Sequence, residues 1–120
     1  MHRHAMYGAD VRDATFHILV ALAREERHGY GIIQRVLELT DGAVRLGAGT
    51  LYGALDRLTA EGQVVATRTE TVDGRERRYY RLTDGGQRTL TAEVARRAAV
   101  VAAAQAEVAD LPGVAVGGTS

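Results

Sequence analysis

The 120-residue chain contains no cysteine and no tryptophan, and lysine is absent too, so that all fifteen strongly basic residues are arginine. Without cysteine, disulfides, thiolate zinc sites and cysteine nucleophiles are excluded. Fifteen acidic residues bring the formal net charge to zero. The total charge therefore indicates no nucleic-acid partner, and only the distribution of charge along the chain can. Arginine suits bidentate contacts with phosphate and guanine better than lysine does.

Long apolar segments are also lacking. The longest apolar run, from Ala98 to Ala104, is far shorter than the roughly 20 residues that span a bilayer. The amino-terminal Met1-His2-Arg3-His4 lacks the apolar region of a signal peptide. We therefore expect a soluble cytoplasmic protein without a membrane partner. This length allows one domain with a modest core, which a partner chain would help to stabilise.

Catalytic groupings are missing as well. None of the four histidines, His2, His4, His17 and His28, has a nearby serine or paired carboxylate at a spacing that suggests catalysis. His2 and His4 could bind a metal ion in a frayed leader, but an accidental His-x-His pair is the simpler interpretation. The Gly-x-Gly pairs lack the preceding strand that a phosphate loop requires. We therefore predict that the protein is not an enzyme and has no catalytic residue, metal site or cofactor.

Apolar spacing predicts a mainly α protein with one small β hairpin. We expect helices over residues 10–24, 30–39 and 47–62, strands over 64–71 and 76–82, and a long helix capped by Thr83. The helix over 30–39 is expected to bury Tyr30, Ile33 and Leu37, with Ile32 and Val36 alongside. Asp73-Gly74 supplies a hairpin turn, and residues 25–29 are expected to form a polar turn. Three helices followed by a hairpin predict a winged helix-turn-helix domain over residues 10–83. A dimerisation helix over 84–111 follows it, with a flexible leader at 1–9 and a flexible tail at 112–120.

The helix expected over residues 47–62 carries the most informative pattern. Leu51, Leu55 and Leu58 repeat at i, i+4 and i+7, which places them on one buried stripe. Short or flat side chains lie off that stripe, and two glycines allow close approach to another backbone. The residues expected to contact DNA on this helix are Gly49, Thr50, Tyr52, Gly53 and Arg57. The alternative is a structural surface helix on which Tyr52 packs sideways and Arg57 pairs with Asp56 or Glu61.

The hairpin is rich in arginine. Arg68, Arg75, Arg77, Arg78 and Arg81 outnumber the acidic Glu70, Asp73 and Glu76. Arginines of a wing suit the phosphate backbone or the narrow minor groove, where they add affinity and salt dependence more than specificity. Arg75 and Arg77 are therefore predicted DNA contacts. The alternative is cross-strand ion pairing, and Arg78 and Tyr80, which share a face with Leu82, are expected to be structural.

The long last helix has an apolar face that the body of the protein is too small to cover. Leu90, Val94, Ala98, Val101 and Val108 recur at helical spacing and are the predicted dimerisation residues. Twofold symmetry would place two recognition helices about 34 Å apart and predicts a palindromic operator. The alternative is a solvated alanine-rich helix that is stable through propensity alone.

Taken in order, these segments resemble the PadR family of bacterial transcriptional repressors. The matching segments are Leu19 to Leu22, His28-Gly29-Tyr30-Gly31-Ile32-Ile33, Gly49 to Leu58, Glu61-Gly62, Gly74-Arg75 and Arg78 to Gly86. The resemblance covers about residues 11–95 and implies a winged-helix dimer that represses a nearby operon until an effector loosens it. It also implies DNA contacts from Thr50, Tyr52 and the wing arginines. The single helix at the end is similar to the smaller PadR subgroup, some of whose members sense drug-like aromatic compounds.

Two departures from the family pattern affect these expectations. The family often has Ser-Pro ahead of the Gly-Thr-Leu-Tyr motif and Pro after it, where this chain has Gly47-Ala48 and Gly53. We therefore expect a less firmly capped start of the recognition helix. No aromatic residue follows Tyr80, which argues against stacking of a flat drug on the last helix. A small hydrophobic effector packing on Phe16, Leu19 and Val101 at the dimer centre is the remaining candidate.

The sequence therefore predicts a homodimeric, sequence-specific DNA-binding regulator that represses transcription from a palindromic operator. Double-stranded DNA, a second copy of the chain and a small hydrophobic effector are its expected partners. Two alternatives belong to other classes. One is a winged-helix protein-interaction module, and the other is a dimer that sequesters a small molecule without binding DNA.

Overall fold

A computed structural model describes residues 13–113 of the chain. Several expectations lie outside the described residues: the leader with His2 and His4, the start of the first helix at Asp10, and residues 114–120 of the tail. The chain forms two compact units, one ending at Leu90 and the other beginning at Thr91. Each unit is described by itself below.

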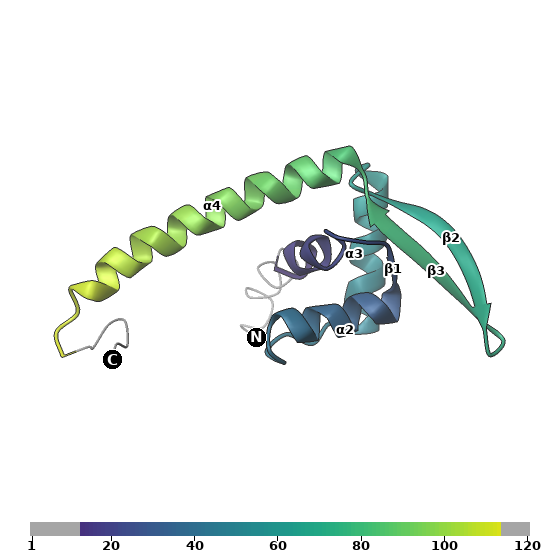
Figure 1. Cartoon of the computed structure of the whole chain (residues 1–120), viewed down its shortest axis with the longest axis horizontal. Helices are drawn as coiled ribbons and strands as arrows, with labels where there is room; N and C mark the ends of the chain where they lie inside the picture. The colour runs from purple at the N-terminus through teal and green to yellow at the C-terminus, as the bar shows by residue number, and fades with distance from the viewer. Residues whose placement is uncertain (1–12, 114–120) are drawn as a thin grey trace, which may run out of the picture. The chain divides into compact units, whose positions relative to one another are not determined.

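The first unit contains the expected helices and hairpin. Within the described range the first helix covers residues 13–21. It is followed by β1 (Arg27–His28), α2 (Gly29–Leu39), α3 (Ala48–Ala60), β2 (Val64–Val72), β3 (Arg75–Leu82) and the start of α4 (Asp84–Ala109) (Figure 1). The predicted fold class, mainly α with a small β hairpin in a winged helix-turn-helix arrangement, is confirmed.

The core lies between the three helices and the base of the hairpin. Leu51, Leu55 and Leu58 of α3 are fully buried, as the leucine stripe predicts. They join buried residues of the other elements, among them Ile18, Leu22, Ile32, Val36, Val64, Tyr80 and Leu82. One sequence expectation is wrong, because Tyr30 was expected to be buried and is 63% exposed. The buried side of α2 carries Gly29, Ile32 and Val36. Tyr30 lies about 100° round the helix from Gly29, on the side away from Ile32 and Val36.

The second correction concerns residues 25–29, which were expected to be a turn only. Arg27 and His28 instead form β1, which pairs antiparallel with β3 through Arg27–Tyr80 and His28–Tyr79. The sheet order is therefore β1-β3-β2. A two-residue strand is too short to show alternation, and its pairing partner lies far away in the sequence. Nothing local in the sequence predicts it.

The hairpin pairs from Val64–Leu82 at its base to Val72–Arg75 at its tip. Asp73 and Gly74 have φ of 53° and 77°, as a tight type I′ turn requires. The register shifts between Ala66 and Arg68, where Thr67 is the extra residue of a β-bulge. Within the first unit the tip of the hairpin projects away from the helices (Figure 1).

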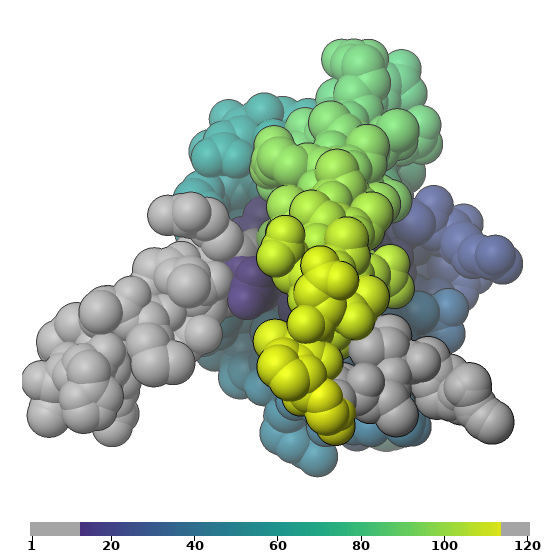
Figure 2. All heavy atoms as spheres, turned by 90° about the vertical axis from the view of Figure 1, so that its left-hand side faces the viewer, coloured from purple at the N-terminus to yellow at the C-terminus, as the bar shows by residue number. Residues whose placement is uncertain are grey.

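The long helix α4 starts where the sequence predicts. The Thr83 hydroxyl accepts a hydrogen bond from the Gly86 amide at 3.0 Å and donates one to the Gly62 carbonyl at 2.6 Å. Leu90 still packs against the core. From Thr91 to Ala109, in contrast, most side chains of α4 are exposed, and Figure 2 shows this part of the helix as green to yellow spheres. None of the helices in residues 13–113 is long and apolar enough to cross a membrane.

Candidate nucleic-acid interface

The outer face of α3 is open, as the sequence predicts. Thr50, Tyr52, Gly53 and Arg57 are all exposed, with Tyr52 exposed to 48%. A Cβ added to Gly49 or Gly53 would have no other atom of residues 13–113 within 4 Å, apart from its chain neighbours and the backbone of α3 itself. The buried leucines hold one side of the helix, so this small, polar side is free for another molecule.

The amino end of α3 has a backbone cap only. Gly47 is the N-cap in an extended conformation, with φ of −78° and ψ of 156°, and has no side chain to accept a hydrogen bond. The first intrahelical bond runs from the Leu51 amide to the Gly47 carbonyl at 2.9 Å. The expected loose start is therefore present, and the amides of the first turn are available to solvent or a ligand.

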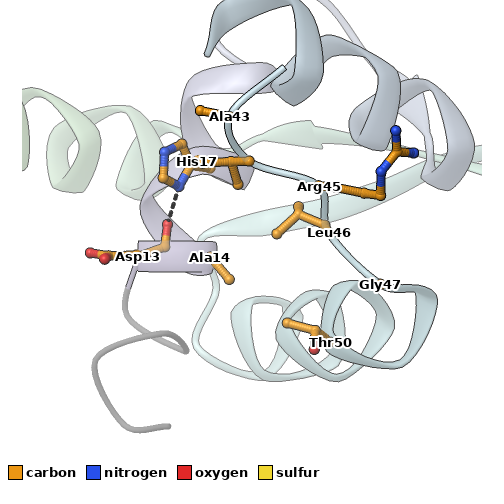
Figure 3. A pocket seen from close by; sticks show the side chains of 9 residues that line it. Asp13, Ala14, His17, Ala43, Arg45, Leu46, Gly47 and Thr50 are labelled. Carbon is orange, nitrogen blue, oxygen red and sulfur yellow. Dashed lines mark hydrogen bonds between the residues drawn. The ribbon is translucent and has the colours of Figure 1, made fainter. Parts of the chain in front are cut away.

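A cavity of about 370 Å³ lies beside this end of α3. Figure 3 shows Thr50 at one side and the first helix at the other, with the loop carrying Leu46 between them. The His17 Nδ1 lies 2.6 Å from the Asp13 carbonyl oxygen and donates to it. Asp13, Ala14, His17, Ala43, Val44, Arg45, Leu46, Gly47 and Thr50 line the cavity. Thr50 therefore stands at the rim of a hollow as well as on the outer face.

Tyr52 reaches across to α2. Its phenol group lies against the backbone of Gly29, and its Cζ is only 2.7 Å from where a Cβ on Gly29 would stand. The next residue, Tyr30, is exposed to 63%. Each helix of the helix-turn-helix thus carries one exposed tyrosine. Tyr30 was not predicted at this surface because a tyrosine beside an apolar stripe is usually buried.

Arg57 has a structural partner that neither sequence interpretation included. Its Nη2 donates to the Thr15 hydroxyl at 2.9 Å, 42 residues away. Arg57 therefore ties α3 to the first helix rather than pairing with Asp56 or Glu61. Arg57 remains exposed. If Arg57 contacts DNA, its guanidinium therefore binds DNA and the Thr15 hydroxyl at the same time.

The structure divides the hairpin arginines into two groups. Arg68 lies 2.6 Å from Glu26, 3.5 Å from Glu70 and 3.7 Å above the centre of the Tyr79 ring. Arg81 donates to the Leu82 carbonyl at 3.0 Å. The side chains of Arg75, Arg77 and Arg78 are exposed, and within residues 13–113 their guanidinium groups have neither a hydrogen bond nor an ion pair. Arg78 was expected to be structural and has no such partner. The positive charge that is free for a ligand is thus concentrated toward the tip, where Arg75 and Arg77 were predicted to bind.

His28 links α2 to the sheet. Its Nδ1 accepts from the Gly31 amide at 3.2 Å and caps α2. Its ring meets the Tyr79 ring edge-on, with 5.2 Å between centroids. Burial lowers the pKa of His28 below its ordinary value, and the nearby Arg77 guanidinium adds to this while the Glu70 carboxylate opposes it. The neutral imidazole that the cap requires is therefore the favoured form.

The predicted dimerisation and effector residues are spread over both units. Val94, Val101 and Val108 are 48%, 54% and 40% exposed, whereas Leu90 packs against the core. Ala98 is also exposed. Phe16 is half-buried and Leu19 is a core residue with 1% exposure. Leu19 is thus not at the surface of the described chain. Among the described residues no cluster of histidine, aspartate or glutamate could hold a metal ion.

An open recognition-type helix on a three-helix core, followed by a hairpin with free arginines at its tip, defines a winged helix-turn-helix protein. The chain belongs to the PadR-like family of transcriptional regulators, whose family model matches residues 18–92. This is a family of regulators and not of enzymes, as predicted from the sequence. The curated transcriptional regulator Rv3488 of Mycobacterium tuberculosis is 44% identical over 75 residues, which is 62% of this chain and 66% of that protein.

Solved structures show the same fold. A PadR-like transcription factor from Bacteroides fragilis superposes with a TM-score of 0.71 at 24% identity, over 84% of this chain and 95% of that one. PadR of Bacillus subtilis, crystallised in complex with operator DNA, gives a TM-score of 0.59 at 28% identity, over 67% of this chain and 45% of that one.

Proposed function

We propose that the chain binds operator DNA with α3 in the major groove and the hairpin on the neighbouring backbone or minor groove. One observation carries this proposal. The outer face of α3 and the side chains of the tip arginines Arg75 and Arg77 are all exposed, and within residues 13–113 these two guanidinium groups have no hydrogen bond or ion pair. The likeness to B. subtilis PadR, which was crystallised with operator DNA, supports it. A repressor acting on DNA in this way would work in the cytoplasm.

The major groove distinguishes all four base pairs and accepts one helix, and residues near the amino end of that helix reach the base edges. Thr50 and Tyr52 stand in this part of α3, and Gly49 and Gly53 let the helix approach the sugar–phosphate chain. Tyr30, exposed in the first turn of α2, adds a hydroxyl suited to a phosphate oxygen. We thus propose that α3 reads the bases, while phosphate contacts from α2 and the hairpin fix the orientation of the protein on the DNA.

We further propose that residues 84–111 form the interface of a homodimer. From Thr91 onward the valines and alanines of α4 are exposed, and a second copy would cover them. Leu90, on the core, would mark the start of this face. The twofold axis implies a palindromic operator with about 34 Å between recognition helices.

A small hydrophobic effector bound near the dimer centre would shift the two recognition helices and release the operator. Val101 and Phe16 are the residues proposed to contact it, whereas Leu19 is buried in the core of the first unit. Such a ligand acts only through a difference in affinity between the DNA-bound and free states.

DNA reading is tested by selecting bound fragments from genomic DNA at physiological salt and measuring affinity by fluorescence anisotropy. Tyr52→Ala should weaken binding to the selected operator by about 1–3 kcal/mol, the range for a base-reading contact. Thr59→Ala changes an exposed residue near the other end of α3 and should leave the affinity unchanged. Unchanged affinity for Tyr52→Ala would remove Tyr52 from the interface. If no fragment is bound, a protein-interaction module or a ligand-sequestering dimer takes the place of a regulator.

Dimerisation is tested by sedimentation of a variant carrying Val94→Asp and Val101→Asp, which should be monomeric because two carboxylates would be buried at the interface. Ala92→Asp with Ala99→Asp introduces the same charges at the same seven-residue spacing on the opposite side of α4. That control should remain a dimer. A dimer that persists in the first variant would refute the proposed interface.

A further inference from the structure

We propose that Glu26 is a positioning residue that holds the hairpin at the angle needed to reach DNA. It does so by joining the segment before β1 to the β-bulge of β2. This inference rests on the proposed function, since it assigns to Glu26 control over where the tip arginines lie. Glu26 itself is not assigned a contact with DNA.

Both carboxylate oxygens of Glu26 are used at the bulge. Oε1 accepts a hydrogen bond from the Thr67 hydroxyl at 2.6 Å, and Oε2 accepts one from Nε of Arg68 at 2.6 Å. Thr67 is the extra residue of the bulge, and Arg68 is the first residue to pair again beyond it. One side chain from outside the hairpin therefore holds the two residues at which the strand is irregular.

The bulge is also where the hairpin leaves the body of the protein. Before it, Val64 and its partner Leu82 are buried in the core. Beyond it, the hairpin from Thr69 to Arg78 is mostly exposed. A bulge bends a strand and increases its twist, and an isolated two-stranded ribbon is only marginally stable. The direction of the outer hairpin is therefore set at Thr67 and Arg68, where Glu26 binds.

The contact continues across the outer face of the sheet. Arg68 lies 3.7 Å above the centre of the Tyr79 ring, and the Tyr79 hydroxyl donates to Oε1 of Glu70 at 2.7 Å. Arg68 Nη1 lies 3.5 Å from Oε2 of Glu70. Tyr79 also meets His28 of β1. Both edges of the three-stranded sheet are thus connected through Arg68 and Tyr79. We call the group formed by Glu26, Arg68, Glu70 and Tyr79 the wing brace.

The wing brace is charged at neutral pH. Hydrogen bonds from Thr67 and Arg68 lower the pKa of Glu26, and the bond from Tyr79 lowers the pKa of Glu70. The hydrogen bond to Glu26 raises the pKa of Arg68. Exposed ion pairs add little to global stability, so the main consequence of the wing brace is the orientation of the hairpin.

Glu26→Ala separates positioning from simple electrostatics. Removal of a carboxylate from a DNA-binding protein would by charge alone strengthen binding. The wing brace predicts the opposite, an affinity about three- to tenfold weaker and a flatter salt dependence, because misplaced tip arginines release fewer counterions. Glu25→Ala is the matched control, since it removes the same charge one residue away, from a side chain 64% exposed that pairs with Arg27 at 3.3 Å.

A second background makes the test specific. In a chain already carrying Arg75→Ala, Arg77→Ala and Arg78→Ala, the hairpin tip has lost its exposed, unpaired guanidinium groups, so Glu26→Ala should weaken binding no further. Additive decreases in affinity would show that Glu26 acts elsewhere and would overturn the inference. Arg68→Lys keeps the charge but removes the stacked, planar guanidinium, so it should behave like Glu26→Ala.

Hydrogen exchange of the hairpin amides gives a readout without DNA. Glu26→Ala should speed exchange in residues 68–79 while the amides of α2 and α3 remain protected as in Glu25→Ala. If the unaltered protein binds no DNA, the proposed function fails, whereas this exchange still tests the wing brace. Equal exchange and equal DNA affinity in the two variants would overturn the wing brace alone.

Discussion

The phenol group of Tyr52 lies against Gly29, and no Cβ fits between them. A Cβ on Gly29 would overlap the phenol oxygen and would stand 2.7 Å from Cζ. Gly29 is buried at the first position of α2, whereas Tyr52 belongs to the exposed face of α3. The backbone of one helix of the helix-turn-helix therefore determines where the proposed base-reading side chain of the other can lie.

Gly29→Ala should consequently weaken operator binding without weakening the fold. The added methyl group meets the far end of a side chain that can turn away, and alanine is preferred over glycine in helices. We expect affinity to fall toward that of Tyr52→Ala, a decrease of at most about 1–3 kcal/mol, with no decrease in urea stability. Gly31→Ala is the control, because the nearest atoms to its Cβ are 3.6 Å away. A fall in affinity that persists in a Tyr52→Ala background would contradict this explanation.

Arg75→Ala with Arg77→Ala should weaken binding to operator and unrelated DNA alike. Neither guanidinium has a hydrogen bond or ion pair within residues 13–113, so the substitutions remove phosphate-binding groups without disturbing the hairpin. The slope of log affinity against log salt should fall by about 0.9 for each phosphate that is no longer neutralised. Anisotropy titrations at several salt concentrations measure this, with Arg88→Ala and Arg96→Ala removing equal charge from α4. An unchanged slope would exclude the hairpin from the interface.

Acid should destabilise the fold through His28. Burial and Arg77 lower the pKa of His28 below 6.5, so the folded state favours the neutral form. This contribution is fully present above pH 6.5 and is lost as the pH falls through the lower pKa of the folded state. His28→Asn keeps an N-cap acceptor that does not titrate. Between pH 7.5 and 5, urea denaturation should show a larger decrease in stability for the unaltered protein than for His28→Asn, and equal decreases would contradict the assignment.

The helix start that the family pattern leaves weak can be repaired. Gly47 has dihedral angles that any residue adopts, and no neighbouring atom lies within 4 Å of its Cβ position among the described residues. Gly47→Ser should stabilise the protein by about 0.5–1 kcal/mol, through a side-chain cap and a less flexible unfolded chain. Gly42→Ser has as much space but a φ of 83°, so it should destabilise. The comparison is made by urea denaturation at one protein concentration, since a dimer's stability depends on it.

Most of the fold could be predicted because its signals are local. The leucines of α3 repeat within one helix, Asp73-Gly74 fits a tight turn, and Thr83 caps the helix that follows it. The bonds that the sequence did not reveal join distant segments, as in the Arg57–Thr15 hydrogen bond across 42 residues. Pairings of this kind leave no periodicity to detect.

The candidate site was predicted less completely for the same reason. Composition marked the hairpin as arginine-rich, but it could not show that Arg68 is used inside the protein while Arg75 and Arg77 remain free. Tyr30 was assigned to the core because it lies among apolar residues, and only the helical phase of Gly29, Ile32 and Val36 shows otherwise. Exposure of single side chains depends on packing that the sequence pattern describes only on average.

The two strands of the hairpin could be longer or shorter with the same tight turn at the tip. Thr71 pairs with Glu76 and Val72 with Arg75 at the tip. Val72 is half-buried and the other three are exposed, and none of the four belongs to the core. Two residues inserted on each side of Asp73-Gly74 would move the tip outward by about 7 Å and keep every side chain on its present face. One residue on each side would instead place the turn next to a pair of the other kind, since hydrogen-bonded and non-hydrogen-bonded pairs alternate along an antiparallel ladder. Related chains could therefore alter their reach along DNA in steps of two residues while the three-helix body stays the same.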